Sequence, residues 1–346
     1  MAAFTTVNDP LAYFNTILYT GTGSDTAFTG VGFQPDFVWC KIRDAIDSSA
    51  LDTSPTGVTT MIHSNSASIT TTAVGLTSFD ADGFTADTRT EINYNTKLFI
   101  SWNWLAGTTT GIAGSPSITP TSYSFNQDAG FSIIAYEGNE ISGATIPHGL
   151  TAAPQCVLTK TLDSGSDWGV YHSHMDATAP EDYAAKFNST AIRTDQIAMW
   201  NDTAPSSTLV TLGNEDRSND ADSMVAWCFT GIAGYSKFGS YRGNGNTDGQ
   251  FIFTGFRPAM IWTKDADYQS GNWNIWSDKI KGYNPQEAML TTNQSAIVQD
   301  KDLDIFANGF KPRDAGQSNE LGSTYIYMAW ANSPFVNSNG VPTNAR

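Results

Sequence analysis

The sequence predicts an all-β protein made of three tandem copies of one antiparallel β-sandwich. Three observations support this prediction: a set of motifs recurs three times in the same order, short apolar segments are separated by turn-forming residues, and strong helical patterns are scarce. Of the 346 residues, only 15% are charged, while serine, threonine, asparagine and glycine supply much of the polarity. That composition is typical of short strands joined by polar turns.

Three motifs mark each predicted copy. A tyrosine precedes a glycine-rich turn, and a glycine and a proline then lead into an apolar strand that ends in lysine. The tyrosines are Tyr19, Tyr136 and Tyr241, the prolines are Pro35, Pro154 and Pro258, and the lysines are Lys41, Lys160 and Lys264. In every copy the lysine stands six residues after the proline. When several different motifs recur in the same order and at a constant spacing, they indicate an internal repeat.

Each copy is predicted to close on an aromatic strand. The tryptophans of these strands are Trp102, Trp227 and Trp330. The resulting domains are 1–108, 109–234, which begins with a flexible linker, and 235–346, which ends in an extended tail. Copies of this length can each bury a core. Seven or eight short strands in roughly 100 residues is the density of a β-sandwich or jelly roll.

The alternation of side chains along a strand places each repeated lysine beside apolar residues. We expect these lysines to lay their stems on the edge of the core and to direct their ammonium groups to solvent or to a carboxylate. Trp168 and Trp273 fall in equivalent strands, where packing between sheets is expected. The three cysteines are too few for a disulfide framework and are expected to be buried thiols.

The formal net charge of −16 argues against nucleic acid and anionic lipid as partners, because like charges repel. No stretch reaches the roughly 20 apolar residues that a membrane span needs. Residues 1–10 lack the charged start and apolar run of a signal peptide. The sequence therefore predicts a protein made in a cytoplasm, without membrane insertion.

Motifs that would carry catalysis do not stand out. There is no nucleophile elbow and no phosphate-binding glycine loop that opens a helix, and none of the 34 acidic residues is marked as one of a glycosidase pair. His172 and His174 share one strand face and form half of a zinc site, but a third ligand is not apparent and an exposed polar strand is the preferred interpretation. We expect no enzyme activity, no metal and no cofactor; whether an acidic turn binds calcium is left open.

Two loops contain candidate ligand contacts. One loop holds Trp200, Asn201 and Asp202, and the other holds Tyr283 and Asn284. A pyranose ring stacks on an aromatic face while amides and carboxylates bind its hydroxyl groups. Both loops are therefore candidate sugar-binding sites, and the alternative is that the aromatic residues only pack.

The motifs together resemble an uncharacterised repeat family of virion proteins from tailed bacteriophages, common in phages of marine bacteria and cyanobacteria. The similar strings are Tyr-x-Gly-x-Gly, Gly-Phe-x-Pro with its following lysine, and segments 234–241 and 325–335. The resemblance runs from about Tyr13 to Phe335. It implies lectin-like sandwiches of the concanavalin or jelly-roll type in tail-fibre, receptor-binding or capsid-surface proteins, and it provides no catalytic residues.

The expected function is that of a non-catalytic structural protein on the virion surface. It would adhere to host-surface glycan as a tail-fibre or receptor-binding component, or serve as a capsid decoration or head-fibre protein. Expected partners are other virion proteins, host glycan and further copies of the chain. The alternatives are a polysaccharide-degrading enzyme of the virion, a depolymerase, and a soluble lectin derived from a prophage.

Overall fold

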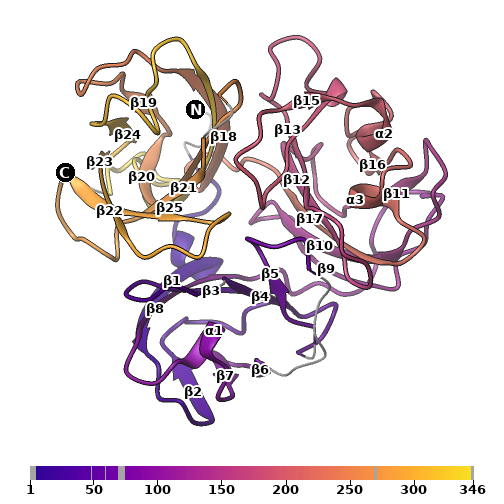
Figure 1. Ribbon diagram of the computed structural model, residues 1–346, viewed down its shortest axis with the longest axis horizontal. Coiled ribbons are helices and arrows are strands. Elements are labelled where there is room, and N and C mark those ends of the chain that lie inside the picture. The colour runs from indigo at the N-terminus through magenta and orange to yellow at the C-terminus, as the bar shows by residue number, and fades with distance from the viewer. Residues whose placement is uncertain (1–4, 48, 59, 69–74, 269–270, 344–346) are drawn as a thin grey trace.

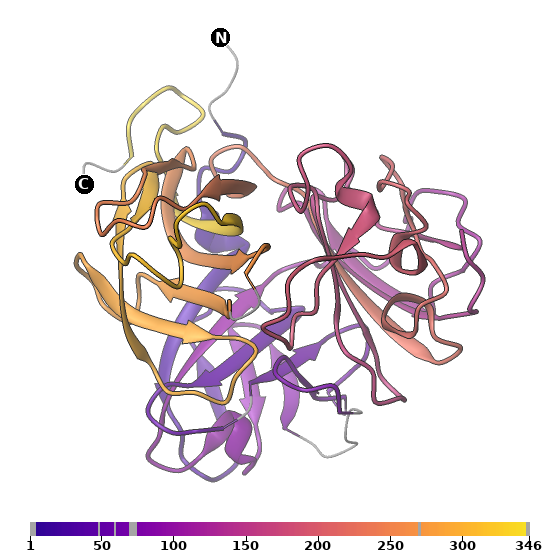
Figure 2. The same ribbon diagram turned by 45° about the horizontal axis from the view of Figure 1, so that its top comes forward.

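The computed structural model describes residues 5–343, apart from 48, 59, 69–74, 269 and 270. Strands hold 41% of the residues and helices 5%, so the predicted all-β class is confirmed. Three lobes surround a common centre (Figure 1). We name them the first lobe (14–104), the second lobe (122–229) and the third lobe (236–334), and Figure 2 shows the second and third standing side by side over the first.

The first lobe is built from two antiparallel sheets. The larger sheet has the order β1 (Phe14–Thr20), β8 (Leu98–Trp104), β3 (Phe37–Ile42), β4 (Ala50–Thr53) and β5 (Ile62–His63). The smaller has the order β2 (Thr26–Thr29), β7 (Gly83–Ala86) and β6 (Leu76–Asp80). The lobe contains the helical turn α1 (Thr90–Asn93), and the turn η1 (Pro10–Ala12) precedes it. Phe28, Val38 and Phe84 are buried together in a core of this lobe.

The second lobe has one large sheet and several short elements. The sheet has the order β13 (Gly169–His172), β12 (Cys156–Thr161), β17 (Ser223–Phe229), β10 (Phe131–Glu137) and β9 (Ser122–Asn126). The strand pairs are β11 (Thr145–Pro147) with β16 (Leu209–Thr211) and β14 (Tyr183–Ala184) with β15 (Thr194–Asp195). The helices are η2 (Pro180–Asp182), α2 (Ile197–Trp200) and α3 (Asp216–Asn219).

The third lobe is a single sheet of eight strands. Its order is β18 (Ser236–Arg242), β25 (Thr324–Pro334), β20 (Phe256–Asp265), β21 (Trp273–Ser277), β22 (Gln286–Thr291), β23 (Gln299–Phe306), β24 (Gly309–Pro312) and β19 (Ile252–Phe253). β20 also contacts β23 and β24, so the sheet folds back on itself around a core.

Four strands have the same order in each large sheet: β1-β8-β3-β4, β10-β17-β12-β13 and β18-β25-β20-β21. The pairing of the repeated tryptophan differs between the first and third lobes. Trp102 pairs with Trp39, two residues before the repeated lysine, whereas Trp330 pairs with Met260, four residues before it. A strand has a period of two, so this shift leaves Trp330 on the same face of its sheet.

One face of each large sheet contributes to a shared central core. Its eight tryptophans are Trp39, Trp102, Trp104, Trp168, Trp227, Trp262, Trp273 and Trp330. Phe187 lies among them, and its ring centroid is 5.7 Å from that of Trp39, 5.5 Å from Trp168 and 5.6 Å from Trp262. The lobes therefore bury smaller cores of their own but depend on one another for this one.

Hydrogen bonds at the rim of the central core link the lobes in a cycle. The indole of Trp168 donates to the carbonyl oxygen of His63 (3.0 Å), and the indole of Trp273 donates to that of Lys186 (2.9 Å). The hydroxyl of Ser64 closes the cycle by donating to the carbonyl oxygen of Thr292 (2.7 Å). Each lobe thus makes a side-chain bond to the backbone of another.

The repeated tyrosine and glycine form a lock with a buried asparagine. In the second lobe the hydroxyl of Tyr136 donates to the carbonyl oxygen of Ser218 (2.7 Å), and the next residue, Asn219, accepts a bond from the backbone N–H of Asn139 (2.8 Å). The same pair of bonds is made by Tyr19 and Asn93 in the first lobe and by Tyr241 and Asn319 in the third. Gly138 packs so closely on this lock that a Cβ would lie 1.7 Å from the carbonyl oxygen of Asp220.

The repeated lysines are buried, which corrects the expectation that their ammonium groups reach solvent. Lys41 donates to the carbonyl oxygen of Gln294 in the third lobe (3.0 Å). Lys264 donates to that of Thr190 in the second lobe (3.3 Å), whereas Lys160 bonds within its own lobe. Burial lowers the pKa of each of the three amines to about 8 because the charged form loses its hydration.

We expect this burial to appear in the pH dependence of stability. Between about pH 8 and 10.5 the unfolded chain binds more protons at Lys264 than the folded chain, so the folded state gains stability as pH rises. The free energy of unfolding of the wild type, relative to that of K264M, should therefore increase from pH 7.5 to pH 10. Urea denaturation at several pH values measures this difference.

The exposed Lys279 provides the matched control. The difference between the wild type and K279M gives the baseline against which the K264M difference is compared over the same pH range. If the difference in the free energy of unfolding between the wild type and K264M changes with pH no more than this baseline, burial does not lower the pKa of Lys264.

A candidate binding groove between the second and third lobes

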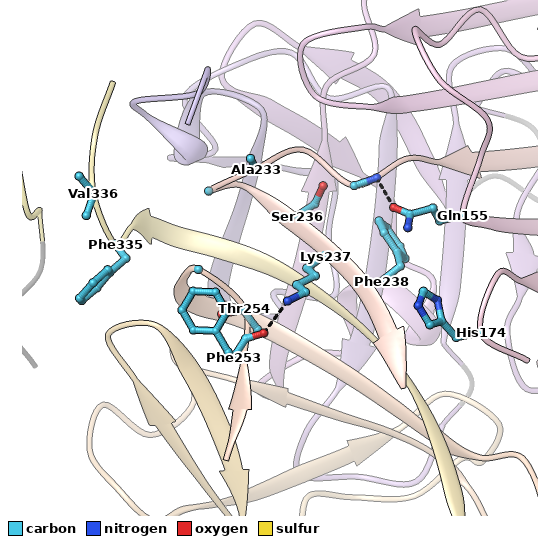
Figure 3. A pocket seen from close by; sticks show the side chains of 13 residues that line it. Gln155, His174, Ala233, Ser236, Lys237, Phe238, Phe253, Thr254, Phe335 and Val336 are labelled. Atoms are coloured by element: carbon cyan, nitrogen blue, oxygen red, sulfur yellow. Dashed lines mark hydrogen bonds between the residues drawn. The ribbon is translucent and has the colours of Figure 1, made fainter. Parts of the chain in front are cut away.

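Two neighbouring hollows form a groove where the second lobe meets the third. The larger has a volume of about 740 Å³ and the smaller about 310 Å³, and His174 lines both. His174 follows β13 of the second lobe, while the opposite wall comes from β18, β19 and the residues after β25. Figure 3 shows the larger hollow with side chains from both lobes.

Aromatic side chains form much of the larger hollow. Phe238 lies on β18 and is buried, whereas Phe253 on β19 is 54% exposed. The alternation of side chains along a strand explains the exposure of Phe253. Its neighbour Ile252 points into the core of the third lobe, so Phe253 points the other way. Phe335, just beyond β25, adds a third ring. The hollow therefore offers ring surfaces to a ligand.

Lys237 and His174 are the titratable side chains among the described residues of the larger hollow. The Lys237 ammonium donates to the carbonyl oxygen of Phe253 (2.7 Å) and lies 5.2 Å from the centre of that ring (Figure 3). Burial lowers the pKa of Lys237. Burial also lowers the pKa of His174, and the charge of Lys237 lowers it further, so the imidazole is neutral at neutral pH.

The smaller hollow contains an ion-pair network. Arg193 lies 3.1 Å from Asp176 and 3.2 Å from Asp267, and its guanidinium stacks over the ring of Tyr183 at 4.8 Å. The backbone N–H and hydroxyl of Thr178 donate to Asp176 and hold its pKa below the usual value. Asp176 is the carboxylic acid among the described residues that line the two hollows. A glycosidase needs two such groups, one of them protonated.

Trp200 does not present a ring face to a ligand, which corrects its prediction as a sugar contact. It ends α2 and is 1% exposed, with its ring against that of Tyr171. Asn201 and Asp202 follow it with left-handed backbone conformations (φ 54° and 44°) and make the turn. The side-chain oxygen of Asn201 accepts a bond from the hydroxyl of Ser142 (2.8 Å), so the amide holds the loop.

Tyr283 and Asn284 lie in the third lobe, so the structure does not bring the two predicted loops together (Figure 1). Tyr283 is 67% exposed, with the ammonium of Lys281 at 4.7 Å from its ring centre, beside a shallow hollow of about 440 Å³. The amide of Asn284 bonds to both the N–H and the carbonyl of Ile305 (3.0 and 2.8 Å). Tyr283 remains a candidate contact, while the Asn284 side chain stabilises its own loop.

His172 is buried where the second lobe meets the third and does not belong to an exposed strand. It is buried, and burial lowers its pKa to about 3. Its Nε2 lies 3.2 Å from the carbonyl oxygen of Tyr327, and its Nδ1 accepts a bond from the N–H of His174 (3.1 Å). Both ring nitrogens therefore form hydrogen bonds with backbone groups. Across the residues described, no three His, Cys, Asp or Glu side chains are grouped so as to hold a metal ion.

Sequence reasoning missed the groove residues, and the signal for them was weak. Phe251, Ile252 and Phe253 are all apolar, so the sequence does not show which of them faces outward. The cysteines, by contrast, are buried and unpaired as expected. Within the described ranges, no helix has the length and apolar character needed to cross a membrane.

The chain was compared with known proteins. No curated protein and no solved structure matches it. A family model described as a domain of unknown function (DUF7483) matches residues 9–334, which is most of the chain. The protein therefore belongs to the DUF7483 family.

Proposed function

We propose that the protein is a non-catalytic structural protein on the surface of a bacteriophage particle and binds host-surface glycan through the groove. The observation that carries this proposal is the lining of the groove, where ring surfaces stand beside hydrogen-bonding groups. Asp176, the carboxylate of the groove, is held ionised by Thr178 and Arg193 and is poorly suited to donate a proton. Such a lining favours recognition over hydrolysis.

The particle role rests on the sequence resemblance together with the architecture. The chain would consist of three tandem sandwich repeats, 1–108, 109–234 and 235–346. The common strand order, the tyrosine–asparagine locks and the buried lysines support this division. The protein would lie either on the tail, as a tail-fibre or receptor-binding component, or on the head, as a capsid decoration. In both positions its partners would be other virion proteins and further copies of the chain.

Replacing Phe253 with alanine should weaken glycan binding by about tenfold or more, because an exposed ring that stacks on a sugar carries much of the contact energy. Binding of purified protein to an array of bacterial surface polysaccharides measures this effect. The matched control is F251A on the same segment, since Phe251 is also exposed but packs against Phe306 outside the groove. Equal binding by F253A and the wild type would place the glycan site elsewhere.

Two further measurements separate the alternatives. Steady release of reducing ends from host polysaccharide would show a depolymerase and overturn the non-catalytic part of the proposal. Gold-labelled antibody on intact particles would show whether the protein lies on heads or tails, and the absence of label on particles would favour a soluble lectin.

A further inference from the structure

The larger hollow differs in charge from the rest of the molecule. The chain has 34 acidic residues against 18 lysines and arginines. Among the described residues that line this hollow there is no aspartate or glutamate, and Lys237 provides its positive charge. In a strongly acidic protein, a hollow with this lining is a place where an anion meets attraction instead of repulsion.

Lys237 differs from the other cation of the groove. Arg193 already has two carboxylates within 3.2 Å, so its charge is balanced. Lys237 has no ion-pair partner among the described residues, and of the three hydrogens of its ammonium group one is directed to the carbonyl oxygen of Phe253. Its charge lies beside an aromatic ring, where water is partly excluded and a bond to an anion is stronger than in bulk water.

We propose that the groove recognises an acidic sugar, one that carries a carboxylate next to an apolar substituent such as an acetyl group. The carboxylate pairs with Lys237, and the apolar substituent covers the rings of Phe253 and Phe335 (Figure 3). This inference rests on the proposed glycan-binding function and adds the class of sugar. The neutral imidazole of His174, on the opposite wall, is placed to bond to a hydroxyl group of the same sugar.

The test removes the contact between Lys237 and the carboxylate in two ways, once by changing the sugar and once by changing the protein. Acidic bacterial polysaccharides are arrayed beside the same polysaccharides after chemical reduction of their carboxyl groups, and the full chain is applied as wild type, K237M and K279M. The wild type and K279M should bind the acidic forms at least about tenfold more tightly than the reduced forms. K237M should bind both forms equally weakly.

Each outcome has a separate meaning. If the wild type retains both forms equally, the acidic-sugar inference is wrong while glycan binding stands. If it retains no glycan, the proposed function and the inference both fail. Because the reduced polysaccharide removes the contact without changing the protein, a folding defect in K237M, detected by circular dichroism, does not prevent a decision.

Discussion

Replacing Phe187 with alanine is expected to lower the free energy of unfolding by about 3–5 kcal/mol, the usual range for deleting a fully buried aromatic ring. The ring touches tryptophans from all three lobes, the nearest being Trp273 with centroids 5.1 Å apart. These neighbours belong to three different lobes, and they cannot close the cavity without moving whole lobes. The loss should therefore lie toward the upper end of the range.

Tryptophan fluorescence during urea denaturation measures this loss, because eight tryptophans lie in the same core. The matched control is F187L, which keeps most of the side-chain volume and should cost much less. A decrease below about 1 kcal/mol for F187A would show that the lobes do not depend on the shared core for their stability.

Replacing Gly138 with alanine is expected to cost about 3 kcal/mol, at the upper end of the range for overpacking. The reason is space and not backbone conformation: the added Cβ would lie 1.7 Å from the carbonyl oxygen of Asp220. Relief requires the turn to move away from Asn219, which breaks the bond between that buried amide and Asn139. The thermal unfolding temperature should fall accordingly.

Gly282 supplies the control, because within the described part of the chain no atom outside its own neighbouring residues lies within 4 Å of a Cβ built there. G282A should leave stability unchanged or slightly raised, since alanine reduces the entropy of the unfolded chain. If G138A and G282A have the same unfolding temperature, the tyrosine–asparagine lock does not constrain this turn.

The strands were predictable because their signals are local. The apolar run before each repeated lysine specifies a strand buried on both faces, and the structure has β3, β12 and β20 there. The tyrosine and glycine of each lock were visible as a motif, but Asn93, Asn219 and Asn319 were not. They stand about 70 to 80 residues later in the chain, and only folding brings them to the turn.

The predictions that failed concern contacts between segments that lie far apart in the sequence. The position of Lys41 shows that it shares a face with apolar residues, but not that another lobe covers that face. Trp200 failed for a different reason: its two loop-forming neighbours suggested an exposed ring, but the ring packs in the core of the second lobe itself.

The shared interior also determines how the molecule can recognise a ligand. The two walls of the groove come from different lobes, and those lobes are packed through a common set of rings, so closing the walls would require that shared core to be disrupted. Recognition would be by a preformed shape, with little ordering cost on binding and little adaptability to other shapes. A single such contact with a small sugar is weak, and firm attachment would come from many copies displayed together.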